Sequence, residues 1–433
     1  MRLARHIIVM NEHLEVSRRL CYHLGCNVFI RIHSRGENVG VKSKLAIVGL
    51  MLFTVFIGFG IIIPVLPQLV TDVSPEAANW HVGPMLTLYS LMSFILAPVW
   101  GGLSERIGRR PVIMIGVLGF SVSFFLFGIS GDNLWLMYAS RILGGLFSGA
   151  VTACIVAYVA DVTTNEQRTK GMAVVGMSIG MGFTFGPLFG GLLSKITHHT
   201  PFFAAALLSL LTFFAAWMKL KESLTPEKRA EARSRKRVSR WTAFQGSLKY
   251  LYALAFFVTF SLAILEATLQ LYGMKKFDVT VMQVGFMFFF CGLVGALVQG
   301  GIVRRYVKNG QEGTFIAVGL VLSAAGFFLL LMAGSWVQAT ICLGVFGVGN
   351  ALLRPCVTSL ITQKTTVDQG TASGLSSSMD SLGRIVGPTL GTLLLGVTQW
   401  LPFVASGVLS LGALILLARF LNLDRHAISH SAS

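Results

Sequence analysis

The feature that most constrains this chain is a series of twelve apolar runs, each long enough to form a membrane-spanning helix. A helix needs about 20 residues to cross the hydrocarbon core of a bilayer. The runs show none of the alternation with a period of two that marks the strands of a membrane barrel. The sequence therefore predicts an all-α membrane protein with twelve transmembrane helices. The expected spans are 45–70, 82–101, 111–130, 134–160, 171–194, 201–219, 249–273, 281–303, 313–334, 337–361, 371–396 and 400–421.

The composition agrees with this class. Of the 433 residues, 54% are hydrophobic and only 12% are charged, which is about half the charged share of a typical globular protein. Both a soluble globular enzyme and a disordered chain are excluded on these grounds. A net charge of +17 would indicate nucleic-acid binding in a soluble protein, but here it reflects a bias among the loops.

That bias predicts the orientation of the chain. Of the 35 Lys and Arg residues, 29 fall on the side of the membrane that carries the termini, and only Lys195, Lys275 and Lys276 lie in loops on the other side. Cytoplasmic loops are the ones enriched in Lys and Arg. We therefore predict cytoplasmic termini, a multi-pass location in the plasma membrane, consistent with a bacterial inner membrane, and no nucleic-acid partner.

Pairs of neighbouring residues that contain glycine recur in the second part of the chain, at an offset close to half the chain length. Gly101-Gly102 returns as Gly300-Gly301, and Gly186-Pro187 returns as Gly387-Pro388. Repeats of this kind are typical of secondary transporters, which bind their substrates between the two halves. The predicted segments are a flexible cytoplasmic extension over 1–44, six-helix bundles over 45–220 and 249–422 joined by a cytoplasmic linker over 221–248, and a tail over 423–433.

The loop after the second expected helix reads GGLSERIGRRP from Gly101 to Pro111 and resembles the G-x-L-A-D-R-x-G-R-K signature of the major facilitator superfamily. The resemblance implies an inner gate at which Glu105 lies near the positive N-terminal end of the helix 371–396, close to Gly370. The glycines would allow a tight turn and close packing. The alternative is an ordinary basic loop. The motif residues are Gly101, Glu105, Arg106, Gly108 and Arg109.

A second motif, GFTFGPLFGG, lies in the fifth expected helix from Gly182 to Gly191. It is similar to the G-x-x-x-G-P-x-x-G-G pattern of the drug:proton antiporter branch of that superfamily. Glycines four residues apart share one helix face and let a neighbouring backbone approach closely, and Pro187 removes a backbone donor. The alternative is generic packing of small residues. The motif residues are Gly182, Gly186, Pro187, Gly190 and Gly191.

Within that branch the chain resembles bacterial quinolone and multidrug efflux pumps with twelve helices. The run Leu265-Glu266-Ala267-Thr268-Leu269 is similar to the acidic segment of their seventh helix, and Leu353-Arg354-Pro355 resembles their tenth. Some of those pumps carry a second acid three residues before this arginine, where this chain has Ala351. Here Asp380 in the eleventh helix is the second acid, which leaves the proton stoichiometry and the cation preference open.

Charged residues inside the expected helices are candidates for function, because each costs at least ~2.5 kcal/mol at the middle of a bilayer. Glu266 and Arg141 lie at similar depths, so they could face each other in one state. We hypothesise that protons and cationic substrates compete for binding to the Glu266 carboxylate. The alternative is a Glu266 carboxylate that stays permanently paired with Arg141.

The remaining candidates surround this pair. Arg354 and Asp380 lie at similar depths in neighbouring helices, and Asp380 and Arg384 are four residues apart on one helix. Either arginine could neutralise Asp380, which leaves a structural role for that acid open. Gln270 lies one turn beyond Glu266, and Phe183 lies beside the glycines of the fifth helix.

No cofactor is expected. Cys21, His23 and Cys26 resemble metal-ligand spacing only loosely, and no phosphate-binding loop of the form G-x-x-x-x-G-K-[ST] occurs, so the proton gradient would supply the energy. The sequence predicts a transporter rather than an enzyme: an antiporter that exports amphipathic or cationic compounds and needs only a monomer. The alternatives are a transporter of one metabolite (a siderophore, a sugar or an amine) and a receptor or scaffold that transports nothing.

Overall fold

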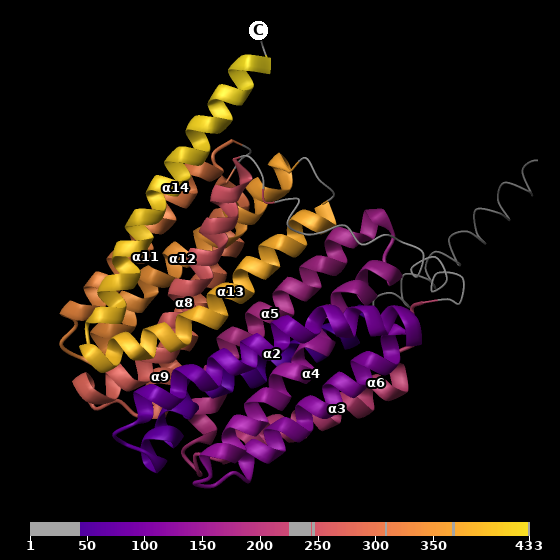
Figure 1. Cartoon of the computed structure of the whole chain (residues 1–433), viewed down its shortest axis with the longest axis vertical. Coiled ribbons are helices and arrows are strands. Elements are labelled where there is room, and N and C mark those ends of the chain that lie inside the picture. The colour runs from indigo at the N-terminus through magenta and orange to yellow at the C-terminus, as the bar shows by residue number, and fades with distance from the viewer. Residues whose placement is uncertain (1–43, 225–243, 245–246, 308–309, 366–368, 432–433) are drawn as a thin grey trace, which may run out of the picture.

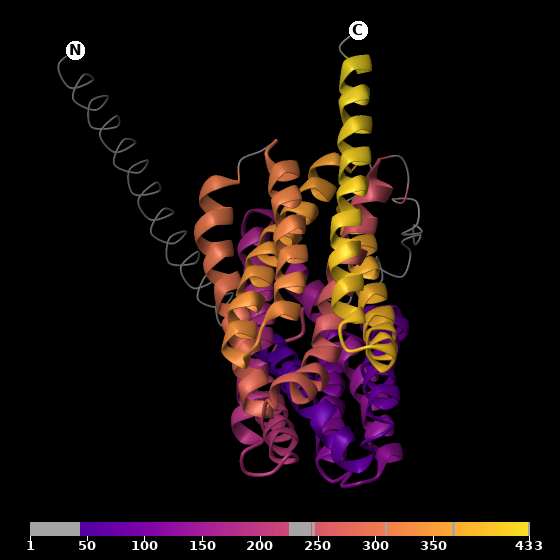
Figure 2. The same ribbon diagram turned by 90° about the vertical axis from the view of Figure 1, so that its left-hand side faces the viewer.

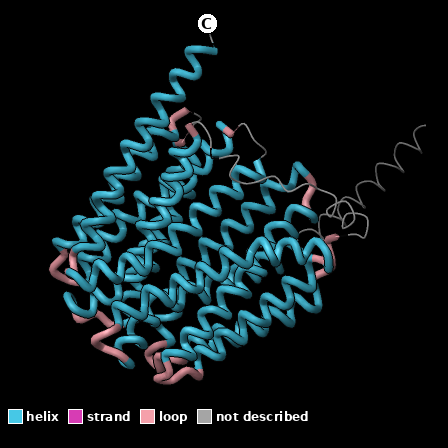
Figure 3. The backbone as a smooth tube through the Cα atoms, viewed as in Figure 1, coloured by secondary structure: helices cyan, strands magenta, loops and turns pink. Residues whose placement is uncertain are grey.

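The computed structural model describes residues 44–224, 244, 247–307, 310–365 and 369–431. The predicted N-terminal extension, most of the linker, and Cys21, His23 and Cys26 lie outside these residues. The described chain consists of long helices joined by short loops, and Figure 3 shows helix over almost all of its length. The predicted all-α fold is confirmed, whereas the domain boundaries and the cytoplasmic orientation of the termini stay predictions.

Twelve long helices lie in the described part of the chain. The first six are Lys44–Val73, α2 (Ala78–Ile107), α3 (Arg109–Gly128), α4 (Leu134–Val162), α5 (Asn165–Leu193) and α6 (Thr200–Lys219). The second six are α8 (Leu248–Phe277), α9 (Val281–Leu297), α11 (Glu312–Met332), α12 (Trp336–Lys364), α13 (Gln369–Val397) and α14 (Leu401–Ser431). The helix α9 continues through a π-helical turn, η2 (Val298–Val303), into the short α10 (Arg304–Tyr306).

Eleven of these helices are long and apolar enough to cross a membrane. The exception is α13, which has 29 residues but includes Asp380, Arg384 and many serine, threonine and glycine residues. It packs along α8 and α2 rather than at the periphery. Its polarity therefore reflects a position inside the bundle, where polar side chains find partners.

Local sequence signals set several helix boundaries. The Asn133 side chain accepts a hydrogen bond from the backbone of Leu136 and caps α4, and Ser335 caps α12 in the same way. Thr280 and Gln283 form a reciprocal capping box at the start of α9. Gly108 separates α2 from α3 with a φ of 112°, a conformation that favours glycine.

Close packing of α5 on the first helix follows from the glycines of the fifth-helix motif. A methyl group at Gly186 would lie 2.7 Å from the Cα atom of Gly60, and one at Gly190 would lie 2.7 Å from the carbonyl oxygen of Ile61. The second half repeats the arrangement, because Gly387 of α13 meets Phe260 and neighbouring residues of α8. These close contacts agree with the packing expected of the motif and with the internal repeat, whereas the functional role of the motif stays a prediction.

The two halves lie beside each other, with α2, α5 and α13 near the centre of Figure 1. The term distal end refers to the end of the bundle at which the helix Lys44–Val73 ends. The opposite end, at which α14 ends, is the proximal end, and it lies at the top of Figure 2. The halves touch mainly through α2 with α13 and α5 with α9.

The contacts between the halves lie in the distal part of these helices. Thr87 donates a hydrogen bond to the carbonyl oxygen of Ile385 at 2.7 Å, and its hydroxyl lies 2.8 Å from that of Thr389. Gly191 of α5 meets Met282 of α9. Gly101, in the proximal part of α2, has no atom within 4 Å of the position of an added Cβ. The halves are therefore closed against each other at the distal end.

Candidate functional site

A buried ion pair joins α8 to α13 near the middle of the bundle. The Nη1 atom of Arg384 donates a hydrogen bond to Oε2 of Glu266 at 3.2 Å, and the two side chains are 18% and 8% exposed. The sequence placed Glu266 opposite Arg141, but in this conformation its partner is Arg384. Arg384 rather than Arg141 therefore neutralises the candidate proton-binding acid.

Aromatic rings from the first half surround the guanidinium of Arg384. Its Cζ atom lies 4.8 Å from the ring centroid of Phe183 on α5 and 5.3 Å from that of Phe59 on the first helix. The two rings contact each other at 5.5 Å. Cation–π contacts of this kind are stronger where water is excluded. Phe183, which was predicted to lie beside the glycines of the fifth helix, contacts Arg384 here, and its role in binding stays a prediction. Phe59 was missed because nothing distinguishes it from the other phenylalanines in the sequence.

A small cavity borders the ion pair at the boundary between the halves. Its walls come from the first helix, α2, α8 and α13, and they include Ser90, Ala263 and Pro388 beside Glu266 and Arg384. The cavity has a volume of about 10 Å³, which is room for roughly one water molecule. The carboxylate and the guanidinium thus meet at the surface along which the two halves must separate if they move.

Arg141 lies fully buried in the first half, on α4. Its guanidinium stacks on Phe127 at 4.4 Å and lies 5.4 Å from the Phe124 ring centroid. Its Nε and Nη2 atoms have no hydrogen-bond partner among the described residues. The Tyr89 phenol is close enough to interact electrostatically with both Arg141 and Arg384. Arg141 therefore adds a positive charge, which no carboxylate in the described structure balances, near the ion pair.

A second ion pair lies nearer the proximal end. Thr259 of α8 donates a 2.7 Å hydrogen bond to Oδ1 of Asp380, and Nη2 of Arg354 lies 3.5 Å from Oδ2 of the same carboxylate. Of the two arginines that could neutralise Asp380, Arg354 is the one that does. Thr259 was not predicted, although it lies seven residues before Glu266 and hence on the same helix face.

Gln270, one turn beyond Glu266, is fully buried. Its side-chain Nε2 and Oε1 atoms have no hydrogen-bond partner among the described residues. A buried amide without partners is costly, so the side chain is available to a ligand or to bound water. Gln270 does not line the cavity at Glu266, and its binding role stays a prediction.

The inner-loop motif forms a compact polar network within the first half. The Nε atom of Arg109 lies 3.2 Å from Oδ2 of Asp161, and its Nη1 atom donates a hydrogen bond to Ser104 at 2.6 Å. The expected tight turn is present at Gly108. Arg106 lies in the last turn of α2, where a positive charge complements the helix dipole.

Two expectations for this motif are not met in this conformation. Gly101 makes no close contact. Glu105 has no hydrogen bond or ion pair to the described residues, and the side chains around Gly370 are not described. Glu105 therefore has no gate partner among the described residues of this conformation, and the gate that the motif predicts stays a prediction.

Glu222 was missed by the sequence analysis. Its carboxylate accepts hydrogen bonds from the backbone N–H groups of Arg109 at 2.9 Å and Arg110 at 3.2 Å, the first two residues of α3. An acid at a helix N-terminus satisfies free donors and the helix dipole. Because Glu222 follows α6, 113 residues after Arg109, no local pattern could have indicated this cap.

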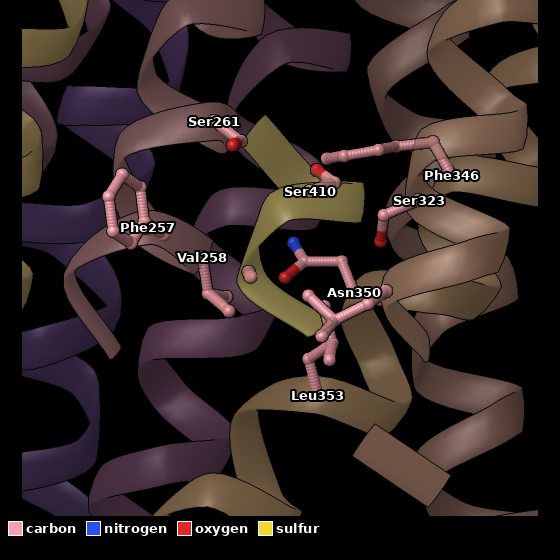
Figure 4. Close-up of a pocket in the computed structure, with 10 residues that line it drawn as sticks. Phe257, Val258, Ser261, Ser323, Phe346, Asn350, Leu353 and Ser410 are labelled. Carbon is pink, nitrogen blue, oxygen red and sulfur yellow. The ribbon is translucent and has the colours of Figure 1, made fainter. Parts of the chain in front are cut away.

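A separate cavity lies within the second half, between α8, α11, α12 and α14. Ser261, Ser323, Asn350 and Ser410 line it together with apolar residues, and Figure 4 shows their polar atoms around one space. Its volume is also about 10 Å³, enough for roughly one water molecule. The Ser323 hydroxyl has no hydrogen-bond partner among the described residues, so a single buried water suits this cavity and a drug-sized compound does not.

Comparison with protein families decides the class. The sequence model of the Major Facilitator Superfamily matches residues 48–311 and 310–433. The chain belongs to the Major Facilitator Superfamily. It is therefore a membrane transporter and not an enzyme, as the sequence analysis predicted.

The relatives carry drug-resistance names. The chain is 32% identical to "Multidrug resistance protein 1" of Bacillus subtilis strain 168, over 85% of this chain and 94% of that protein. It is 28% identical to "Quinolone resistance protein NorA" of Staphylococcus aureus strain MRSA252, over 87% and 96%. These similarities agree with the predicted family branch and with a location in a bacterial cell membrane.

Solved structures share the fold. The human organic anion transporter MFSD10 (TETRAN) superposes with a TM-score of 0.67 at 25% identity, covering 87% of this chain and 99% of its own. A bacterial homologue of the human lysosomal transporter Spinster, in an inward-facing and unoccupied conformation, gives a TM-score of 0.66 at 14% identity, over 89% and 97%. The arrangement of helices described above is thus that of superfamily transporters.

Proposed function

We propose that this transporter exports amphipathic compounds that carry a positive charge, in exchange for protons, by alternating access of its two halves. The observation that carries the proposal is the buried Glu266 carboxylate at the boundary between the halves, paired with the Arg384 guanidinium, which itself lies against two aromatic rings. The drug-resistance relatives support export of drugs. The proton gradient supplies the energy without a cofactor, and a monomer suffices.

The coupling follows from competition for one carboxylate. A proton on Glu266 removes the charge that attracts a cation, and a bound ammonium group displaces the proton. One buried carboxylate cannot hold both, so substrate and proton move in opposite directions. Arg384 takes the place of the substrate cation while the site is empty, which avoids a bare buried charge.

The test uses inverted membrane vesicles that contain wild-type protein, Glu266→Gln or Asp380→Asn. A pH-sensitive dye reports proton release from an acidified lumen when norfloxacin is added. We expect release by the wild type and none by Glu266→Gln, because an amide cannot exchange a proton in this range. We expect Asp380→Asn to retain release, since Arg354 already neutralises that acid.

Two outcomes contradict the proposal. Release by Glu266→Gln at the wild-type rate would move the coupling to another group. No release by well-expressed wild type, for norfloxacin or for ethidium, would favour transport of a single metabolite instead.

A further inference from the structure

We propose that the Glu266–Arg384 pair selects amphipathic zwitterions, so that one substrate carries both the ammonium group that binds Glu266 and a carboxylate that binds Arg384. This inference rests on the proposed function and names the substrate class of the same site. It assigns a second substrate-binding group, Arg384, beside the acid.

The charges around the site carry the argument. Asp380 is neutralised by Arg354 and Glu266 by Arg384, while Arg141 has no carboxylate partner in the described part of the chain. In the empty state, one buried guanidinium is therefore uncompensated. The two ion pairs are balanced in charge, so the buried charge that lacks a partner is the positive charge of Arg141 in the first half.

A substrate with a positive charge alone would make this imbalance worse. Its ammonium group would take the Glu266 carboxylate and leave Arg384 as a second uncompensated cation in a region of low dielectric. An unpaired buried charge is strongly unfavourable. A zwitterion avoids the penalty, because its carboxylate replaces Glu266 as the partner of Arg384 while its ammonium group replaces Arg384 as the partner of Glu266.

The geometry around Arg384 suits this exchange. The guanidinium is planar and can bind a carboxylate through two parallel hydrogen bonds. Its hydrogen bond to Glu266 uses a single Nη1 atom at 3.2 Å. The rings of Phe59 and Phe183, which lie against the guanidinium, can stack on a flat aromatic substrate placed next to it. The neighbouring cavity holds only about one water molecule, so a substrate enters by separating the pair.

The arrangement also keeps antiport intact. The ammonium group of the zwitterion still competes with a proton for Glu266. A simple anion would instead bind Arg384 and leave Glu266 without its partner, so that Glu266 would bind a proton at the same time as the anion and the exchange would be lost. The site therefore favours a carboxylate and an amine on one molecule over either charge alone.

The experiment compares three probes in direct binding to purified protein by intrinsic fluorescence. Norfloxacin has a carboxylate and a protonated piperazine near neutral pH, its methyl ester keeps the rings and the amine without the carboxylate, and ethidium is a permanent cation. For the wild type we expect norfloxacin to bind at least about tenfold more tightly than its ester, since a charge-assisted hydrogen bond supports a factor of that size. For Arg384→Gln we expect this ratio to fall to about one and ethidium to bind more tightly.

Arg384→Lys is the matched variant. It keeps the positive charge without the planar fork, so an intermediate ratio is expected, and thermal unfolding of each variant checks that it folds. A wild-type ratio near one overturns the proposal whether or not any variant folds, and so does an equal loss of all three probes in Arg384→Gln. Since binding is measured without a proton gradient, failure of proton release alone would contradict the antiport and leave the zwitterion preference standing.

Discussion

Glu266 and Asp380 each pair with an arginine of a neighbouring helix in this transporter, whereas Arg141 stacks on aromatic rings of its own half. Glu266, Asp380 and the three arginines inside the helices stood out in the sequence because charges are rare inside apolar runs. Position along a helix gives the depth of a side chain but not the direction in which the helix faces its neighbours. Glu266 therefore has Arg384 of α13 as its partner, while Arg141 stacks on rings of its own half.

The polar network at the start of α3 gives a prediction at the residue scale. Arg109→Ala removes the charged partner of Asp161 and of Ser104 and should lower the free energy of unfolding by about 1–3 kcal/mol, the usual contribution of hydrogen bonds to a charged group. Thermal unfolding in detergent would measure it. Arg106→Ala is the control, because Arg106 is exposed, and an equal loss in both variants would contradict the network.

The cap of α3 gives a second test. Glu222→Ala leaves the backbone donors of Arg109 and Arg110 without this acceptor and should cost about 1 kcal/mol, as for other helix caps. Glu222→Gln keeps an acceptor oxygen and should cost less. The thermal unfolding midpoints of the two variants would measure these losses. The same midpoint for Glu222→Ala and the wild type would contradict the capping role.

Whole helices were predicted well, because hydropathy reports the segment that lies within the bilayer. The expected span 82–101 is part of α2 (Ala78–Ile107), and 134–160 is nearly all of α4 (Leu134–Val162). The helices run past the apolar segment, where hydropathy gives no signal. The π-helical turn η2 (Val298–Val303) was missed for the same reason, since hydropathy does not report the hydrogen-bonding pattern of a helix.

The glycines of α5 give a prediction at the scale of the element. Gly186→Ala forces the first helix and α5 apart, because the added methyl group would lie 2.7 Å from the Cα atom of Gly60. We expect a loss of about 1–3 kcal/mol of stability, the range for an overpacked core. Gly176→Ala is a matched control on the same helix, since an added Cβ there meets nothing within 4 Å, and it should be neutral or slightly stabilising. Similar thermal midpoints for both variants would contradict the role of the close contact.

For the whole molecule, the internal repeat predicted two halves with a site between them. The structure has two six-helix halves with the Glu266–Arg384 pair at their boundary, and the site itself stays a prediction. The sequence could not predict which end of the bundle is closed, because one sequence specifies both states of a transporter and their energies differ little. The contacts of Thr87 with Ile385 and Thr389 belong to the state described here.

Alternating access requires these distal contacts to break. In a variant without native cysteines, Thr87→Cys with Thr389→Cys places two thiols where the hydroxyls lie 2.8 Å apart. We expect oxidation to cross-link the halves and to lower the rate of substrate-induced proton release at least about tenfold. Reduction of the disulfide should restore the rate. Each single cysteine variant is the control. Full activity in the cross-linked protein would show that the distal ends need not separate.

The polarity of α13 also has a consequence for how the chain enters the membrane during synthesis. Helices join the lipid from the insertion machinery according to their apolar character, and α13 is the one long helix of the described structure that falls short of a membrane span by composition. Its ionised side chains meet their partners on α8 and α12, and both of those helices precede it in the chain. We therefore expect newly made α13 to depend on α8 and α12 for its insertion, so that the residues proposed to bind substrate would first help to bring α13 into the bilayer.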